Sequence, residues 1–187
     1  MMTKASTHVA QFFDDDRVSV RRIADFLVDG ARSGDAIVIV ATTEHVRAIE
    51  RRLASLGAHV EALAAEGRYH ALDARTAMQR VCPSGSPNSV LFGEVIGGAV
   101  ERAAAGGGRV RAYGELVSLL WNAGRRDDAI QIEHLWNELL NFHEVRLLCG
   151  YSFSGAIDAA GFGRIAATHL TLEPPPARLF GTRISAS

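Results

Sequence analysis

The chain has few of the features that mark a secreted or membrane-spanning protein. Its 187 residues include only two cysteines, Cys82 and Cys149, which lie far apart and form no CxxC spacing. This pattern argues against a disulfide framework or a structural zinc site, and it fits a reducing cytoplasm. No apolar run approaches the roughly 20 residues of a membrane span, and residues 1–16 lack the apolar core of a signal peptide. We therefore expect a cytoplasmic protein with no membrane partner.

The chain also lacks a strong excess of charge of either sign. Twenty basic and 21 acidic residues give a formal net charge of −1, which provides no general attraction to nucleic acid. The short basic clusters at 21–22, 51–52 and 125–126 lie among apolar positions of predicted helices, so we interpret them as solvated faces. With 48% hydrophobic and 22% charged residues, the composition is that of a globular protein with one full core. We expect no direct binding of nucleic acid.

Glycine is missing where a nucleotide-binding α/β protein would need it. Residues 8–30 predict a strand, a tight turn and an amphipathic helix, and the turn holds three aspartates, Asp14–Asp16. A phosphate loop needs glycines to wrap phosphate with backbone N–H groups and a lysine to reach it, and neither lies between Phe13 and Val18. Carboxylates would repel a triphosphate. We expect them instead to cap the helix, which stabilises a protein by about 0.5–2 kcal/mol.

The rest of the chain alternates strand and helix patterns. The continuous apolar run at 36–41 is typical of a strand buried on both faces of a parallel sheet, and 146–151 also lacks polar alternation, so we expect both to be interior strands. Other strands are predicted at 69–74, 109–113, 145–152 and 168–173. Helices are predicted after Thr42–Thr43, at 75–81, after the loop 82–89 and at 127–143, and a broken helix is predicted at 156–167. This order predicts a single-domain α/β fold, a mostly parallel sheet with helices on both faces. The domain is expected over 8–173, between an N-terminal extension (1–7) and a flexible tail (174–187).

Two family resemblances follow from the order of these pieces. The stretch "FLVDGARSGDAIVIVATTEHVRAIERRLASLG", followed by "GRYHALDA", resembles the KaiC branch of RecA-like ATPases just after their phosphate loop. The pieces "HVAQFF", "RVRAYGELVSLLW", "IEHLWNELLN", "LLCGYS" and "ATHL", spread over residues 8–173, resemble the MEDS family, the sensory domain of DcmR-type regulators. That family is itself similar to KaiC but lacks the phosphate loop. The resemblance implies a signal-input module, joined in many members to a DNA-binding domain or a histidine kinase.

Three candidate ligand-binding residues carry polar groups. Glu115 follows the strand 109–113, at the edge where open parallel sheets bind ligands, and the resemblance places it in the family's "GE" motif. The alternative is a carboxylate that bonds backbone N–H groups of its own turn. Glu133 and Asn137 are four residues apart and share one helix face, matching the family's "YExxLN" pattern except that Ile132 replaces the tyrosine. They are expected at a pocket rim, although Asn137 bonding a neighbouring loop is the other interpretation.

Three aromatic residues complete the expected site. Tyr113, Trp121 and Tyr151 lie at or after strand ends, where they could line a pocket rather than only fill the core. We expect one cavity at the carboxyl edge of the sheet, with these rings as walls and Glu115, Glu133 and Asn137 as its polar groups.

The histidines follow no metal-binding spacing. His8, His134, His143 and His169 form neither HExxH nor HxH, so hydrogen-bonded core histidines are favoured over metal ligands, and no metal or cofactor is predicted. The resemblance matches His8, Phe13 and His169 to family positions, and we expect the two histidines to anchor the ends of the first and last strands. Cys149, within a predicted strand, is interpreted as a buried small hydrophobic residue.

These features favour a non-catalytic sensory or regulatory module that binds a small, rather apolar organic ligand. Only seven residues precede His8, so we expect the signal to pass in trans to a partner such as a histidine kinase or a transcription regulator. The alternative is a protein-binding adaptor with no ligand, and a nucleotide-using KaiC-like enzyme is least favoured. No Ser-His-Asp arrangement is recognisable, and Ser118 lies in no GxSxG elbow. Homo-oligomerisation is left open.

Overall fold

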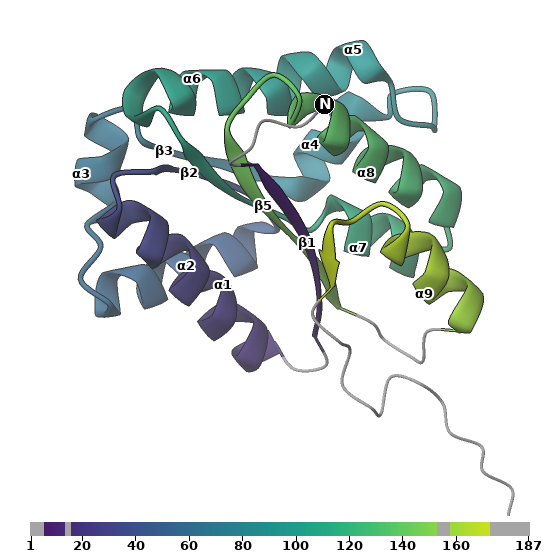
Figure 1. Cartoon of the computed structure of the whole chain (residues 1–187), viewed down its shortest axis with the longest axis horizontal. Coiled ribbons are helices and arrows are strands. Elements are labelled where there is room, and N and C mark those ends of the chain that lie inside the picture. Colours follow the sequence, from purple (N-terminus) through teal and green to yellow (C-terminus); the bar gives the residue numbers. More distant parts are fainter. Residues whose placement is uncertain (1–5, 14–15, 153–157, 173–187) are drawn as a thin grey trace, which may run out of the picture.

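A single parallel sheet organises the molecule. Figure 1 shows the computed structural model, which describes residues 6–13, 16–152 and 158–172. Within these residues six strands pair in the order β3-β2-β4-β5-β1-β6, and every pair is parallel. The strands are β1 (Thr7–Phe13), β2 (Ala36–Ala41), β3 (Tyr69–Asp73), β4 (Val110–Gly114), β5 (Val145–Ser152) and β6 (Thr171–Leu172). The predicted α/β class is confirmed.

Both strands expected in the interior lie there. β2 pairs with β3 and β4, and β5 pairs with β4 and β1. Each residue of Ala36–Ala41 is buried, as the continuous apolar run predicts, because helices cover the sheet on both sides.

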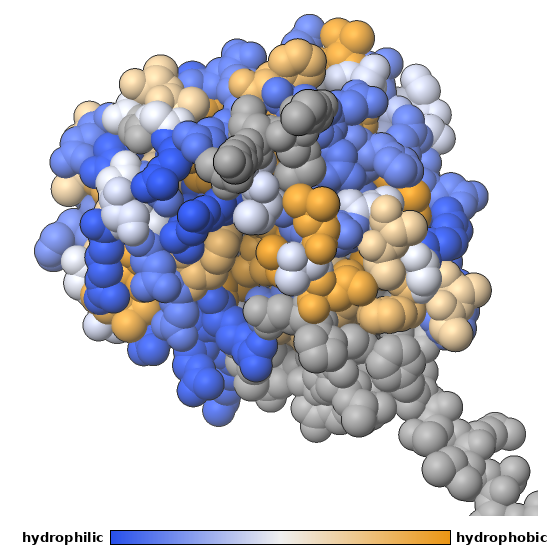
Figure 2. Space-filling model, viewed as in Figure 1, coloured by the Kyte–Doolittle hydropathy of each residue, from blue (hydrophilic) through white to orange (hydrophobic). Residues whose placement is uncertain are grey.

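Two hydrophobic cores lie on the two faces of the sheet. The first core lies between the sheet and the helices on the side that we call the α8 face. These helices are α4 (Ala74–Val81), α5 (Ser89–Phe92), the π-helical turn η1 (Gly93–Gly97), α6 (Gly98–Gly107), α7 (Leu116–Asn122), α8 (Arg126–Leu139) and α9 (Ala159–Ala166). The second core lies on the opposite side of the sheet, the α1 face, which is covered by α1 (Asp16–Arg32), α2 (Thr43–Ser55) and α3 (Val60–Ala65). On the side seen in Figure 2, hydrophilic residues lie around the outline and groups of hydrophobic residues lie toward the middle. Among the described residues the large hydrophobic side chains that remain exposed are Val90, Phe142 and Leu170.

Alternation along the strands decides which core each side chain enters. In β5, Cys149 belongs to the α8 face and Leu148 to the α1 face. In β1, Ala10 and Phe12 belong to the α8 face and Phe13 to the α1 face, which places His8 with the former. The candidate site residues are sorted between the two faces by the same rule.

Some boundaries differ from the sequence-based prediction. The strand expected at 168–173 begins only at Thr171, because Thr168 and His169 still donate backbone N–H groups to Ile165 and Ala166 at the end of α9. The helix expected at 127–143 ends at Leu139.

Other predictions fall partly or wholly outside the described residues. Asp14 and Asp15 lie there, and α1 begins at Asp16, so the predicted capping stays a prediction. Residues 1–5 and the tail 174–187 are not described either. No helix in the described ranges combines the length and apolar character needed to cross a bilayer.

Candidate functional site

Glu115 lies at the carboxyl end of the central strand β4. Its backbone N–H donates to Val40 O at 3.0 Å, which ties the start of α7 to the end of β2. The residue is only 5% exposed, and its carboxylate accepts hydrogen bonds from three groups: the backbone N–H of Thr42, His45 Nδ1 at 2.6 Å and the Tyr113 hydroxyl at 3.3 Å. Because the carboxylate only accepts, His45 Nδ1 carries the proton.

A pocket of about 240 Å³ opens above this carboxylate, at the carboxyl ends of β1, β2, β4 and β5. We call it the Glu115 pocket. It is lined by Phe13, Ser19, Thr42, His45, Arg75, Tyr113, Glu115, Ser118, Leu119, Asn122, Gly150 and Ser152. Open parallel sheets bind ligands at this edge.

The far wall of the Glu115 pocket is fixed by the end of β5. Ser118 Oγ donates to Ser152 O and accepts from Ser152 N–H, both at 3.0 Å, and Asn122 Nδ2 donates to Ser152 O at 2.6 Å. The Tyr113 ring lies across Gly150, where a Cβ would come within 2.6 Å of the tyrosine oxygen. A glycine is therefore required for the ring to reach Glu115.

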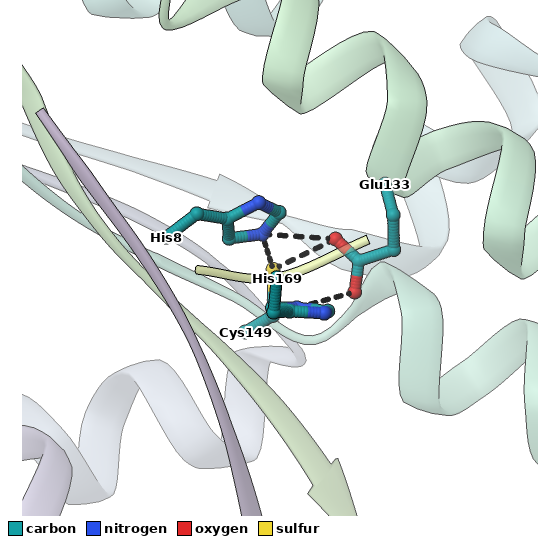
Figure 3. A group of neighbouring side chains, drawn as sticks. All are labelled: His8, Glu133, Cys149 and His169. Carbon is teal, nitrogen blue, oxygen red and sulfur yellow. Dashed lines mark hydrogen bonds and ion pairs between the residues drawn. The ribbon is translucent and has the colours of Figure 1, made fainter. Parts of the chain in front are cut away.

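A second group of polar side chains lies on the α8 face and is sealed inside the protein. Figure 3 shows Glu133 pointing from α8 toward His8, Cys149 and His169, which we call the Glu133 cluster. The side chains of Glu133, His8 and His169 are fully buried, and Cys149 is buried as well. Such a group requires internal partners, because burying an uncompensated charge is costly.

Glu133 is the centre of this cluster. Its Oε2 lies 3.1 Å from His8 Nε2 and accepts from Cys149 Sγ at 3.2 Å. Its Oε1 lies 3.2 Å from His169 Nε2 and accepts from the Tyr151 hydroxyl at 2.5 Å. The helix α8 turns Glu133 inward because its neighbours Ile132 and Trp136 are core residues.

Burial and mutual charge set the protonation of the Glu133 cluster. Burial alone would raise the pKa of Glu133, but the attraction of His169 and His8 outweighs it and lowers that pKa well below the ordinary value. Burial likewise opposes a charged His169, and the Glu133 carboxylate outweighs it, so the pKa of His169 is raised. Burial and then Glu133 raise the pKa values of Cys149 and Tyr151 well above their usual range. Without a bound cation the thiol and the phenol therefore stay protonated.

The structure divides the six residues that were expected to line one cavity. Tyr113 and Glu115 line the Glu115 pocket. Trp121, Glu133, Asn137 and Tyr151 do not line it, and Trp121 and Tyr151 belong to the core of the α8 face. The expectation of a single cavity is wrong, because Tyr113 and Tyr151 extend from opposite faces of the sheet. A ligand-binding role for these residues stays a prediction.

The family-motif residues also separate between the faces. Phe13 lines the Glu115 pocket. His8 and His169 lie against each other, with ring centroids 4.1 Å apart, and the backbone N–H of Leu170 donates to His8 O at 3.1 Å.

Among the residues that sequence reasoning missed, His45 and Cys149 contact the two buried glutamates directly. His45 lies in the first turn of the helix that follows β2, so its position next to a strand end was a usable signal for the Glu115 pocket. Cys149 is buried as expected, but its sulfur faces Glu133 and His8 instead of only apolar atoms. The signal was the alternation of β5, which puts Cys149 and Tyr151 on one face.

Comparisons with known proteins agree with this architecture. The family model described as "MEthanogen/methylotroph, DcmR Sensory domain" (MEDS) matches residues 7–170. Among solved structures, the KaiC-like protein PH0186 from the hyperthermophilic archaeon Pyrococcus horikoshii OT3 is similar in fold, with a TM-score of 0.53 and 19% identity. The match covers 85% of this chain and 67% of that one. No curated protein matches the sequence.

Proposed function

Because the chain belongs to the MEDS family of sensory domains, we propose that it is a sensory module whose input is a small organic molecule bound in the Glu115 pocket. One observation carries the proposal. A glutamate that is 5% exposed lies at the end of a central strand, and three donors hold its carboxylate on the floor of a pocket. A shaped pocket with a few convergent polar groups is the usual form of a small-molecule site.

The chemistry of the pocket favours a small ligand that carries at least one hydrogen-bond donor. A volume of about 240 Å³ lies below the range of drug-sized pockets, so the ligand has few heavy atoms. A carboxylate offers about four acceptor positions, and three donors reach Glu115 from the described residues. The remaining position suits a hydroxyl or amine. Phe13 and Leu119 offer apolar surface for the rest of the molecule.

The position of Glu115 also suggests how binding would be transmitted. Glu115 is the residue before α7, and its partners Thr42 and His45 begin α2 on the opposite face of the sheet. A ligand that competes for this carboxylate would therefore change the contacts of two helix starts at once. The signal would then pass to a partner such as a histidine kinase or a transcription regulator.

A non-catalytic role is part of the proposal. The Ser118 hydroxyl, which also accepts from Asn122 Nδ2 at 3.5 Å, both donates to and accepts from the backbone of Ser152, so it is engaged in holding β5. The sequence between Phe13 and Val18 also lacks the glycines and lysine of a phosphate loop.

A thermal-shift screen of small alcohols and amines tests this function. A compound present at 100 times its dissociation constant should stabilise the wild type by about 2.7 kcal/mol. The stabilisation should be lost in Glu115→Gln and kept in Glu138→Gln, a matched control at an exposed position of α8. Compounds that stabilise Glu115→Gln as strongly as the wild type would place their site elsewhere. No stabilising compound at all would favour the protein-binding adaptor.

A further inference from the structure

We propose that the Glu133 cluster is a binding site for a divalent transition-metal cation of the zinc class. The four ligand atoms are His8 Nε2, His169 Nε2, Cys149 Sγ and a carboxylate oxygen of Glu133. They come from four separate segments, namely β1, the turn after α9, β5 and α8, and they all lie within 4.8 Å of one another. The site is independent of the Glu115 pocket, with which it shares no residue.

The spacing of these atoms is close to that of a tetrahedral site. Zinc lies about 2.0–2.1 Å from nitrogen or oxygen and about 2.3 Å from sulfur, so neighbouring ligands are about 3.3–3.6 Å apart. Here His8 Nε2 lies 3.1 Å from Glu133 Oε2 and 3.3 Å from Cys149 Sγ. The Cys149 sulfur lies 3.2 Å from Glu133 Oε2, and His169 Nε2 lies 3.2 Å from Glu133 Oε1. No pair of ligand atoms is more than 4.8 Å apart, so the widest separation exceeds such an edge by at most roughly 1 Å, which a small inward shift of the side chains would close.

Outer hydrogen bonds hold both histidines in the orientation that metal ligands need. His8 Nδ1 faces Asn137 Oδ1 at 2.9 Å, and the Asn137 amide is fixed because its Nδ2 donates to Thr168 O at 2.9 Å. His169 Nδ1 lies 2.8 Å from Ile165 O. Both of these partners only accept, so each Nδ1 carries the proton. In a neutral imidazole the Nε2 lone pair then points into the cluster, which is the arrangement that supports metal-bound histidine.

One of these nitrogens lacks a well-directed partner. The side chain of His169 is fully buried, yet its Nε2 has no hydrogen-bond partner in the described part of the chain, although Glu133 Oε1 is only 3.2 Å away. Buried polar atoms are nearly always satisfied, and an exception requires an explanation. A cation between the two atoms would satisfy the nitrogen and the carboxylate together.

The mixture of ligand types selects the class of cation. Two imidazoles and a thiolate suit zinc and its neighbours, whereas Mg²⁺ and Ca²⁺ require oxygen ligands. Because the ligands must lose protons from the thiol and the imidazoles, binding should weaken as the pH falls. The ion would join the turn before the short edge strand β6 to β1, β5 and α8.

Metal titration of the full chain tests the site. After treatment with a chelator, the protein should bind one Zn²⁺ per chain in calorimetry, with Mg²⁺ and Ca²⁺ unable to compete. Co²⁺ should give the visible spectrum of a tetrahedral site and a sulfur-to-cobalt charge-transfer band. Cys149→Ser should lose that band, and Cys149→Ser and His169→Gln should each weaken Zn²⁺ binding more than the 10–100-fold that an outer-shell change such as Asn137→Ala typically costs.

Matched controls separate this site from adventitious binding. Cys82→Ser removes the other cysteine, and His134→Gln removes an exposed histidine of α8, so both should bind like the wild type. If Cys149→Ser does not fold, as judged by circular dichroism, a retained charge-transfer band in Cys82→Ser still assigns the sulfur to Cys149. Absence of stoichiometric binding, or a band that survives Cys149→Ser, would overturn the proposal and leave a purely structural polar network.

Discussion

The Glu115 pocket and the Glu133 cluster use the same three residue types in different surroundings. Each has a buried glutamate that contacts histidine and a tyrosine hydroxyl: His45 and Tyr113 on the α1 side, His8, His169 and Tyr151 on the α8 side. Glu115 also receives a backbone N–H and borders a pocket. Glu133 is sealed and depends on side chains alone. Side-chain chemistry therefore does not define the site; access to solvent does. A pocket carboxylate can exchange one donor for a ligand, whereas a sealed one can exchange only protons or a metal ion.

The largest difference between the two sites should appear when a glutamate is removed. Glu133→Ala leaves the buried His169 without its counter-charge and removes a partner of His8, which should cost about 3–5 kcal/mol of unfolding free energy. Glu115→Ala, beside a pocket that water can enter, should cost about 1–3 kcal/mol. Urea denaturation of both variants measures these losses. The exposed Glu138→Ala is the control, and its unfolding free energy should stay within about 0.5 kcal/mol of the wild-type value. Equal losses at the two sites would contradict the contrast between sealed and open carboxylates.

The second largest effect should be a pH dependence of the stability, which arises from the Glu133 cluster. A lowered pKa of Glu133 gives stability that is present above its ordinary value of 4.5 and is lost as the pH falls further. A raised pKa of His169 gives stability that is complete below its ordinary value of 6.5 and is lost as the pH rises through the raised value. The metal-free protein should thus be most stable between these two pH values. Urea midpoints from pH 4 to 9 test this, and Glu133→Gln should flatten the profile; an unchanged profile would assign the dependence to other groups.

A smaller effect is expected from a substitution that disturbs only the Glu115 pocket. In Gly150→Ala the new methyl group meets the Tyr113 ring, so the ring must move away from Glu115 at a cost of about 1–3 kcal/mol. Gly163→Ala is the matched control, because a Cβ there meets no atom within 4 Å. Near-ultraviolet circular dichroism and urea denaturation should show the change only in Gly150→Ala. If both variants behave alike, the close approach of Tyr113 to β5 is not a constraint.

The smallest expected effect is at the pocket rim. His45→Ala removes one hydrogen bond to Glu115, but the histidine side chain is 25% exposed, so water replaces much of the interaction. The expected loss is about 1 kcal/mol or less. His8→Ala, in the sealed cluster, should cost several times more in the same urea experiment. A reversed order would mean that the pocket, and not the cluster, is the more rigid of the two sites.

The sequence predicted the fold better than it predicted the sites, for a physical reason. The continuous apolar run at 36–41 is enough by itself to indicate a buried strand, and the position of Glu115 after a strand follows from local spacing. The Glu133 cluster depends on the register that sets His8 opposite Leu147 and Ala10 opposite Cys149, and on how α8 docks over β5. Neither quantity is encoded in the periodicity of any one segment. The sequence therefore placed Glu133 at a pocket rim, His8 and His169 at strand ends and Cys149 among apolar atoms, and only the tertiary structure brings the four side chains together.

The place of β1 in the sheet has a consequence for how the protein is made. β1 is the first strand of the sheet in chain order, yet it pairs with β5 and β6, so that Ala10 lies beside Cys149 and Leu172. Until β5 has been synthesised, β1 has no neighbouring strand in the sheet, and its apolar side chains lack the partners that they have in the finished fold. The strands β2, β3 and β4 pair with one another and can assemble first. Such long sequence separations between contacts slow folding, so completion of the sheet is expected to be a late, post-translational step.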